Sequence, residues 1–303
     1  MKKLILLAAL QIAAPSARAQ FDTADHLQIS MKPAISFNLS SGTFTYLFQV
    51  ASASSSAQVL EYLTLVEADA DTDSGGTISQ ILKPTNVTSW EGDYADNFGG
   101  IKTNSVSWYS AWPTSSTDDL MHPSPEALQP GKSLTNLGLI STFLPGPTTF
   151  YAQGWVIPAT QEQIDAKLGA SPATEPSGRQ LQAIYPAALP INKNSFHGLT
   201  IGPMQSPVGL TPAALVDRLA ALKHQALTLG WISGPGAEGV VQSLDAKLTA
   251  AKAALARGDA KAAEGQLTAF INELNAQHGK LIDDNAFFML QANAQFILAK
   301  LGP

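Results

Sequence analysis

The stretch that decides the C-terminal fold is Ser243–Lys280, which reads SLDAKLTAAKAALARGDAKAAEGQLTAFINELNAQHGK. Apolar residues in its first half and just before it alternate in steps of three and four, which places them on one face of an α-helix. These residues are Val241, Leu244, Leu248, Ala251 and Leu255. The Arg257-Gly258-Asp259 tripeptide breaks the pattern, because Gly258 can end a helix with a positive φ and Asp259 can cap the next one. We therefore interpret this adhesion-like tripeptide as a helix stop and cap.

Three further helices with the same spacing are predicted before and after this one. One begins at Asp259 and stops at Gly279, a second is capped by Asp283, and an upstream one begins at Thr211-Pro212 and ends at Gly230. Each carries a single apolar stripe, which must be buried against a neighbour. Residues of about 210–301 are therefore predicted to form a four-helix bundle. The stripes contain Ala263, Leu267, Phe270, Ile271 and Leu274; Phe287, Leu290, Ala294, Ile297 and Leu301; and Leu215, Leu219, Leu222, Ala226 and Leu229.

The segment ALARGDAKAAEGQLTAFINELNAQHGK, Ala254–Lys280, resembles the FIMAH domain, a small helical module of secreted bacterial proteins. The resemblance extends over Leu215–Leu301. It implies an extracellular accessory module, with no catalytic residues to carry over. The segments HQALTLGWI (His224–Ile232) and NSFHGLTIGP (Asn194–Pro203) are similar to parts of uncharacterised secreted proteins.

The N-terminus has the pattern of a secretory signal peptide. Lys2 and Lys3 precede a short apolar run, and Ala17-Arg18-Ala19 is an A-x-A cleavage site, so residues 1–19 are expected to be removed. The apolar run is too short to span a membrane, and no second such run follows. The chain has no cysteine, which excludes disulfides and thiolate metal sites. We expect a secreted or periplasmic protein without a transmembrane segment.

Charge is distributed unevenly along the chain. Of the 18 basic and 24 acidic residues, three basic ones fall in the signal, which leaves 15 basic and 24 acidic residues, a net charge of −9. Residues 209–303 hold eight of each sign, so the whole excess lies in residues 20–208. An acidic domain is repelled by phosphate backbones, so nucleic acid is not an expected partner.

Residues 20–157 are dominated by strand patterns. In Thr43–Val50 the residues Phe44, Tyr46, Phe48 and Val50 alternate on one face. Further strands are predicted at Val59–Val66, Ser105–Trp112, Ser133–Phe143 and Phe150–Ile157, with Pro145-Gly146-Pro147 as the turn between the last two. Several short strands with regular turn signals predict an antiparallel β-sandwich of the immunoglobulin-like or fibronectin-like class.

The domains are therefore predicted as a signal peptide (1–19), a β-sandwich domain (20–207) and a helical domain (208–303). The last part of the sandwich domain, residues 158–207, is rich in Pro, Ser and Ala. It is interpreted as an irregular excursion of the sandwich or as a linker. Within it, Thr160–Leu168 has the pattern of a short helix.

A candidate metal site lies in the sequence DADTDSG. Asp69, Asp71 and Asp73 stand at positions one, three and five, as in loops that wrap Ca²⁺ with oxygen ligands. The glycine, Gly75, comes one position late, and Gln80 stands where such loops carry a glutamate. The alternative is a solvated acidic hairpin loop, and calcium is the only cofactor that the sequence suggests.

The tryptophans Trp90, Trp108, Trp112 and Trp155 all lie in the acidic domain. Exposed aromatic rings can stack on sugars, but the alternation of Val106 with Trp108 favours a place in the core. Tyr109 points to the opposite face and is the better surface candidate.

Catalytic candidates are few. Glu91, Asp93 and Asp96 form an acidic cluster near Trp90, and Asp118 and Asp119 precede His122; paired carboxylates of this kind can cleave glycosides. The five histidines are scattered without metal-binding spacing, and no nucleophile motif is present. Charged turns are the plainer interpretation of both acidic clusters, so no catalytic residue is assigned from the sequence.

The sequence therefore predicts an exported, non-enzymatic protein of the binding, adhesion or envelope-associated type, with an acidic sandwich that binds protein or polysaccharide at the cell surface. The helical module serves as an accessory unit. The alternatives are a secreted carbohydrate hydrolase that uses the loop carboxylates, which requires a cleft with two facing acids, and a purely structural component.

Overall fold

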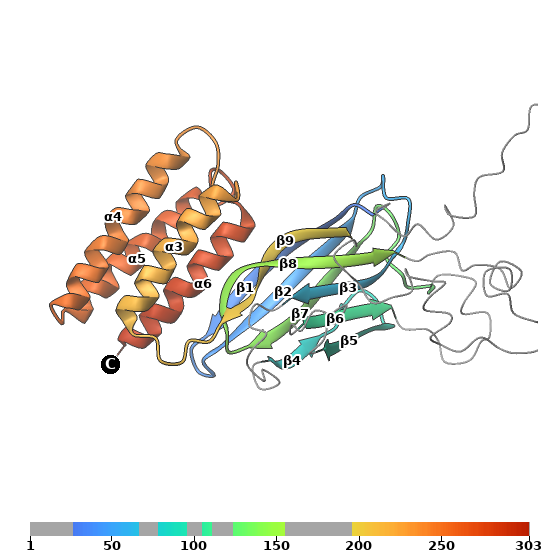
Figure 1. Ribbon diagram of the computed structural model, residues 1–303, viewed down its shortest axis with the longest axis horizontal. Coiled ribbons are helices and arrows are strands. Elements are labelled where there is room, and N and C mark those ends of the chain that lie inside the picture. Colours follow the sequence, from blue (N-terminus) through green and yellow to red (C-terminus); the bar gives the residue numbers. More distant parts are fainter. Residues whose placement is uncertain (1–26, 67–77, 96–104, 111–123, 155–195, 303) are drawn as a thin grey trace, which may run out of the picture.

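The computed structural model describes residues 27–66, 78–95, 105–110, 124–154 and 196–302. Two antiparallel sheets lie at one end of the elongated molecule and four helices at the other (Figure 1). The sandwich and bundle predicted from the sequence are both confirmed. In the described residues no helix is long and apolar enough to cross a membrane.

The first sheet has four strands in the order β1-β2-β7-β4. The strands are β1 (Ile29–Asn38), β2 (Thr43–Ser52), β7 (Ser133–Ser141) and β4 (Ile78–Leu82). The predicted alternation in β2 is confirmed, because Phe44, Tyr46, Phe48 and Val50 are at most 1% exposed. Strands β1 and β4 were not predicted from the sequence.

The second sheet has five strands in the order β5-β6-β3-β8-β9. The strands are β5 (Trp90–Ala95), β6 (Ser105–Ser110), β3 (Leu60–Val66), β8 (Leu144–Gly154) and β9 (Phe196–Gln205). Strand β9 comes from the segment expected to be irregular, and it pairs with β8 along its length. The inner faces of both sheets form the core, in which Trp90 and Trp108 are at most 1% exposed.

The Pro145-Gly146-Pro147 segment corrects one prediction. These residues do not form a turn but belong to β8, where they pair with Pro203, Gly202 and Ile201 of β9. Proline is tolerated in a strand only where its missing N–H is not needed. Among the described residues, β3 pairs with β8 only between Phe150 and Gly154, so the two prolines lie beyond the end of this pairing.

The helices are α3 (Pro212–Thr228), α4 (Ala237–Ala256), α5 (Ala260–Gln277) and α6 (Asp284–Leu301). Each packs against two others, in the cyclic order α3-α4-α5-α6. The predicted caps Asp259 and Asp283 are confirmed, because each accepts a hydrogen bond from the N–H three residues later. Thr211, at the predicted start of α3, accepts one in the same way from Ala214. Gly230, Gly258 and Gly279 follow the helix ends with φ of 73–75°, the left-handed region that suits glycine.

The bundle meets the sandwich through α6, which packs against β1 and also contacts β8 and β9. The buried apolar residues of the two parts form one connected cluster, from Leu27 in the sandwich to Ile297 in α6. Helices α4 and α5 lie on the side of the bundle away from the sheets (Figure 1).

Candidate functional site

The outer face of the five-stranded sheet carries the side chains best suited to bind a ligand. In the strand register, Tyr62 of β3 lies opposite Tyr109 of β6, which lies opposite Glu91 of β5. The rings of Tyr62 and Tyr109 stack with their centroids 5.6 Å apart and their planes 12° from parallel. Both side chains are partly exposed, whereas Trp108, one residue before Tyr109, is fully buried. The predicted orientation of Tyr109 away from the core is confirmed.

The next row of the register extends this face toward the other edge of the sheet. Tyr151 of β8 lies opposite Thr64, and His197 of β9 lies opposite Tyr151, with the two rings 5.7 Å apart. Between the large side chains, the hydroxyls of Thr64 and Ser107 are 2.8 Å apart and buried. We call the outward residues Tyr62, Tyr109, Tyr151, Glu91, Asp93 and His197 the tyrosine face.

The charge of the tyrosine face is mainly negative at its β5 edge. Glu91 and Asp93 project from the same side of β5, because they are two residues apart in a strand. Glu91 forms an ion pair with Lys83, in which both side chains are about half exposed. Partial burial raises the pKa of the Tyr109 hydroxyl, and the neighbouring Asp93, Tyr62 and Glu91 raise it further. Tyr109 is therefore a protonated hydrogen-bond donor at neutral pH.

The inner side of the sheet fixes the direction in which these side chains point. The indole N–H of Trp108 donates to the carbonyl of Leu82 at 3.1 Å. A Cβ atom at Gly92 would lie 2.5 Å from Cγ2 of Ile81 and 3.1 Å from Cδ1 of Trp108. Because Gly92 is opposite Trp108 in the register, the absence of its side chain lets the large indole fill the space between the sheets.

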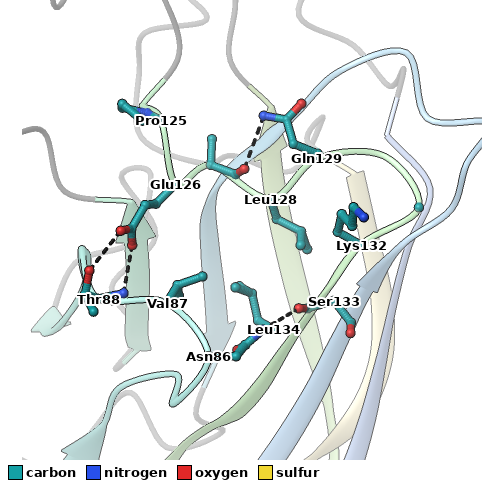
Figure 2. A pocket seen from close by; sticks show the side chains of 12 residues that line it. Asn86, Val87, Thr88, Pro125, Glu126, Leu128, Gln129, Lys132, Ser133 and Leu134 are labelled. Carbon is teal, nitrogen blue, oxygen red and sulfur yellow. Dashed lines mark hydrogen bonds between the residues drawn. The ribbon is translucent and has the colours of Figure 1, made fainter.

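A second feature is an open hollow of about 570 Å³ beside the loops that precede β5 and β7 (Figure 2). Its lining includes Val87, Leu128 and Leu134. The Glu126 carboxylate at its rim accepts the N–H groups of Thr88 and Ser89 at 2.8 and 2.7 Å, and the Thr88 hydroxyl at 2.8 Å.

The polar side chains of Glu126 and Asn86 beside this hollow are hydrogen-bonded to other residues of the two loops. Chiefly the Ser89 N–H, and then the Thr88 hydroxyl, lower the pKa of Glu126 to about 2. Asn86 likewise donates to the carbonyl of Ser133 and accepts from Thr135. These groups tie the two loops together, and they leave the tyrosine face as the stronger candidate site.

The other predicted site residues divide into two groups. Glu91 and Asp93 lie in strand β5 rather than in the loop that the acidic pattern suggested, because they pair with Tyr109 and Ser107. The remaining candidates lie outside the described residues: Asp69, Asp71, Asp73, Asp96, Trp112, Asp118, Asp119, His122 and Trp155. In the described part of the chain, no group of three or more His, Cys, Asp or Glu side chains is placed to hold a metal ion.

Sequence reasoning missed Tyr62, Tyr151 and His197 as members of the site. Tyr62 is next to the buried Leu63 in β3, and Tyr151 is next to the buried Phe150 in β8. Because successive strand residues point to opposite faces, the outward direction of both tyrosines could be inferred from the strand pattern alone. Their proximity could not, since it depends on which strands pair.

The fold therefore defines a two-part protein: an antiparallel β-sandwich with an aromatic and acidic outer face, joined to a capped four-helix bundle. Residues 215–299, which run from α3 to α6, match the FIMAH domain family. The match identifies the bundle as a FIMAH domain and confirms the resemblance found in the sequence. No curated protein matches the chain. A FIMAH domain fits the part of a non-enzymatic accessory module.

Proposed function

We propose that this protein is an exported polysaccharide-binding protein, in which the tyrosine face binds the glycan and the FIMAH domain is the accessory module. The observation that supports the proposal is the stacked pair of Tyr62 and Tyr109 beside two carboxylates on an outward sheet face. Aromatic rings that keep one polar end in contact with water are typical of such contact surfaces. Export rests on the signal-like residues 1–19.

The chemistry of the face favours neutral or basic glycans. Tyrosine rings offer apolar surface to the C–H groups of a sugar, and their hydroxyls donate and accept hydrogen bonds. Glu91 and Asp93 accept hydrogen bonds from sugar hydroxyls or from amino groups. Uronic acid polymers are disfavoured, because the domain that bears the face carries the whole net charge of −9.

Binding is favoured over hydrolysis by the arrangement of the two carboxylates. A glycosidase needs two carboxyl groups that flank the scissile bond. Glu91 and Asp93 project side by side from one strand, and Glu91 is engaged by Lys83. This arrangement suits recognition of hydroxyl or amino groups better than acid–base chemistry.

The test is isothermal titration of the chain from Gln20 onward with oligosaccharides of a neutral β-glucan, of chitosan and of alginate. We expect binding to one of the first two and none to alginate. Tyr109→Ala and Tyr62→Ala should each weaken binding by about tenfold or more, as for aromatic anchors at other interfaces. Tyr109→Phe separates the contribution of the ring from that of the hydroxyl.

Leu39→Ala is the matched control, because Leu39 is 71% exposed and follows β1 in the opposite sheet. It should leave the affinity unchanged. Equal affinities of wild type and Tyr109→Ala, or tightest binding to alginate, would contradict the proposal. Titrations with Ca²⁺ and with a chelator, repeated on Asp71→Ala, test the predicted calcium loop in the same experiment.

A further inference from the structure

The contact between bundle and sandwich is organised around one arginine. Arg218 of α3 donates from Nε to Oε1 of Gln205 at 2.6 Å, from one Nη to Oδ1 of Asn293 at 2.6 Å, and from the other to the carbonyl of Pro145 at 2.9 Å. The guanidinium thereby connects β9, α6 and β8. Partial burial lowers its pKa to about 10, so Arg218 is still charged at neutral pH.

Asn293 of α6 completes this polar cluster. Its side chain is 3% exposed, and its amide nitrogen donates to the carbonyls of Pro145 at 3.0 Å and Met289 at 2.8 Å. The carbonyl of Pro145 therefore accepts from both Arg218 and Asn293. The bonds to Gln205 and to the carbonyl of Pro145 cross from the bundle to the sandwich, whereas those from Arg218 to Asn293 and from Asn293 to Met289 lie within the bundle. The buried Asn293 amide therefore has its full set of hydrogen bonds only when the bundle is docked.

An aromatic contact lies beside the polar cluster. Phe296 of α6 is 4% exposed, and its ring centroid lies 5.4 Å from that of Phe37 and 5.7 Å from that of Phe44. Phe37 and Phe44 face each other across the β1–β2 hairpin. The Phe296 ring therefore continues the aromatic core of the sandwich into the bundle.

The shape of β8 at this point fits the helices. A Cβ atom at Gly146 would lie 3.0 Å from Cβ and Cγ of Met204 and 3.4 Å from Nη2 of Arg218. Glycine between the two prolines thus leaves room for the guanidinium to reach the neighbouring carbonyl. The Pro145-Gly146-Pro147 segment, which has the sequence pattern of a turn, is therefore the part of β8 that Arg218 contacts.

We infer that the α3–α6 face of this FIMAH domain is a docking surface whose partner is the end of the chain's own sandwich, at β1 and the Pro145-Gly146-Pro147 segment. The bundle is a fixed part of the fold and not a module on a flexible tether. Any external partner of the bundle then meets α4 and α5, since the opposite side is occupied. This docking is independent of the ligand proposed for the tyrosine face.

The connection between the two parts allows a direct test. Between β9 and α3 the chain passes through Val208, which is 86% exposed, and Gly209, where a Cβ atom would have no neighbour within 4 Å. A protease recognition sequence inserted between these two residues gives a chain that can be cut after it has folded. Size-exclusion chromatography with light scattering then shows whether the halves stay together.

We expect the cut wild-type chain, loaded at about 1 μM, to elute as one complex of both fragments. Specific interfaces have dissociation constants in or below this range. Arg218→Ala and Phe296→Asp should each weaken the association of the fragments by about tenfold or more, since the first removes three hydrogen bonds at the contact and the second a buried ring. Lys252→Ala is the control, because its exposed ion pair with Asp217 lies between α4 and α3. It should leave the complex intact.

Separation of the cut wild-type fragments would overturn the inference, and so would a complex that survives both Arg218→Ala and Phe296→Asp. Circular dichroism of the uncut variants distinguishes undocking from unfolding of the bundle, because undocking preserves the helical signal. If Phe296→Asp loses that signal, Arg218→Ala, at a partly exposed position, decides the question.

Discussion

The bundle and the sandwich are held by contacts of very different range along the chain. In the bundle, the Asp259 carboxylate caps α5 by accepting the N–H of Ala262, three residues away. In the sandwich, the Tyr46 hydroxyl donates to the carbonyl of Phe143, 97 residues away, and the Trp90 indole to that of Glu126, 36 residues away. The helices are therefore bounded by local chemistry, whereas the sheets depend on distant segments meeting in one register.

Substitutions of glycine are expected to give the largest difference in stability between the sandwich and the bundle. In β7, a Cβ atom at Gly138 would lie 2.0 Å from the carbonyl oxygen of Tyr46 in the paired strand, so Gly138→Ala should destabilise the protein by about 3 kcal/mol or more. In α5, nothing lies within 4 Å of such an atom at Gly265, so Gly265→Ala should stabilise the protein by about 0.5–1 kcal/mol. Urea unfolding monitored by circular dichroism measures both. Effects of the same sign would contradict the comparison.

The acid dependence of the sandwich loops is expected to be smaller. The pKa of Glu126 is lowered from 4.5 to about 2 by its hydrogen bonds to Ser89 and Thr88. A lowered folded-state pKa contributes stability above pH 4.5 that is lost as the pH falls toward 2. Glu126→Gln should therefore destabilise the protein by about 1 kcal/mol at pH 7 and by less at pH 2.5.

Melting temperatures of wild type and Glu126→Gln over this pH range measure the difference between the two proteins, which cancels the titration of their other carboxylates. Leu39→Ala, at an exposed position with no titratable group, is the control and should show a constant difference. A constant difference for Glu126→Gln as well would mean that the carboxylate does not tie the two loops.

An effect of similar size, confined to one helix end, concerns a cap. Asp259→Ala removes the acceptor for the Ala262 N–H and should cost about 1 kcal/mol, whereas Asp259→Asn retains an acceptor and should cost less. Chemical denaturation of the three proteins measures this order. A loss above that of Gly138→Ala would show that the bundle also depends on long-range contacts at this position.

Much of the fold could be predicted from the sequence because several of its rules are local. The helix boundaries at Gly230, Asp259 and Asp283 follow from residues within one turn of each end. The inward face of β2 follows from its alternation. Strand β9 and the strand role of Pro145-Gly146-Pro147 were missed, because proline and glycine in a sequence usually indicate a turn. They can belong to a strand where the missing proline N–H is not needed for pairing, and this depends on which strands are neighbours.

The candidate site divides along the same line. The outward direction of Tyr109 follows from the buried Trp108 beside it, since successive strand residues point to opposite faces. That Tyr62 stacks on Tyr109, with Glu91 on its other side, follows only from the order β5-β6-β3. Strand order depends on pairing between segments far apart in the chain. This pairing cannot be inferred from the spacing of residues within each strand.

The two-part architecture, the four helices and the acidic character of the first part could all be predicted from the sequence, because periodicity, capping and charge are properties of nearby residues or of composition. The three-dimensional fold was needed to learn which strands are neighbours, which tyrosines share a face, and that Arg218 and Asn293 donate to the carbonyl of Pro145. These depend on bringing together residues far apart in the chain, at a cost in chain entropy that the shared apolar core offsets.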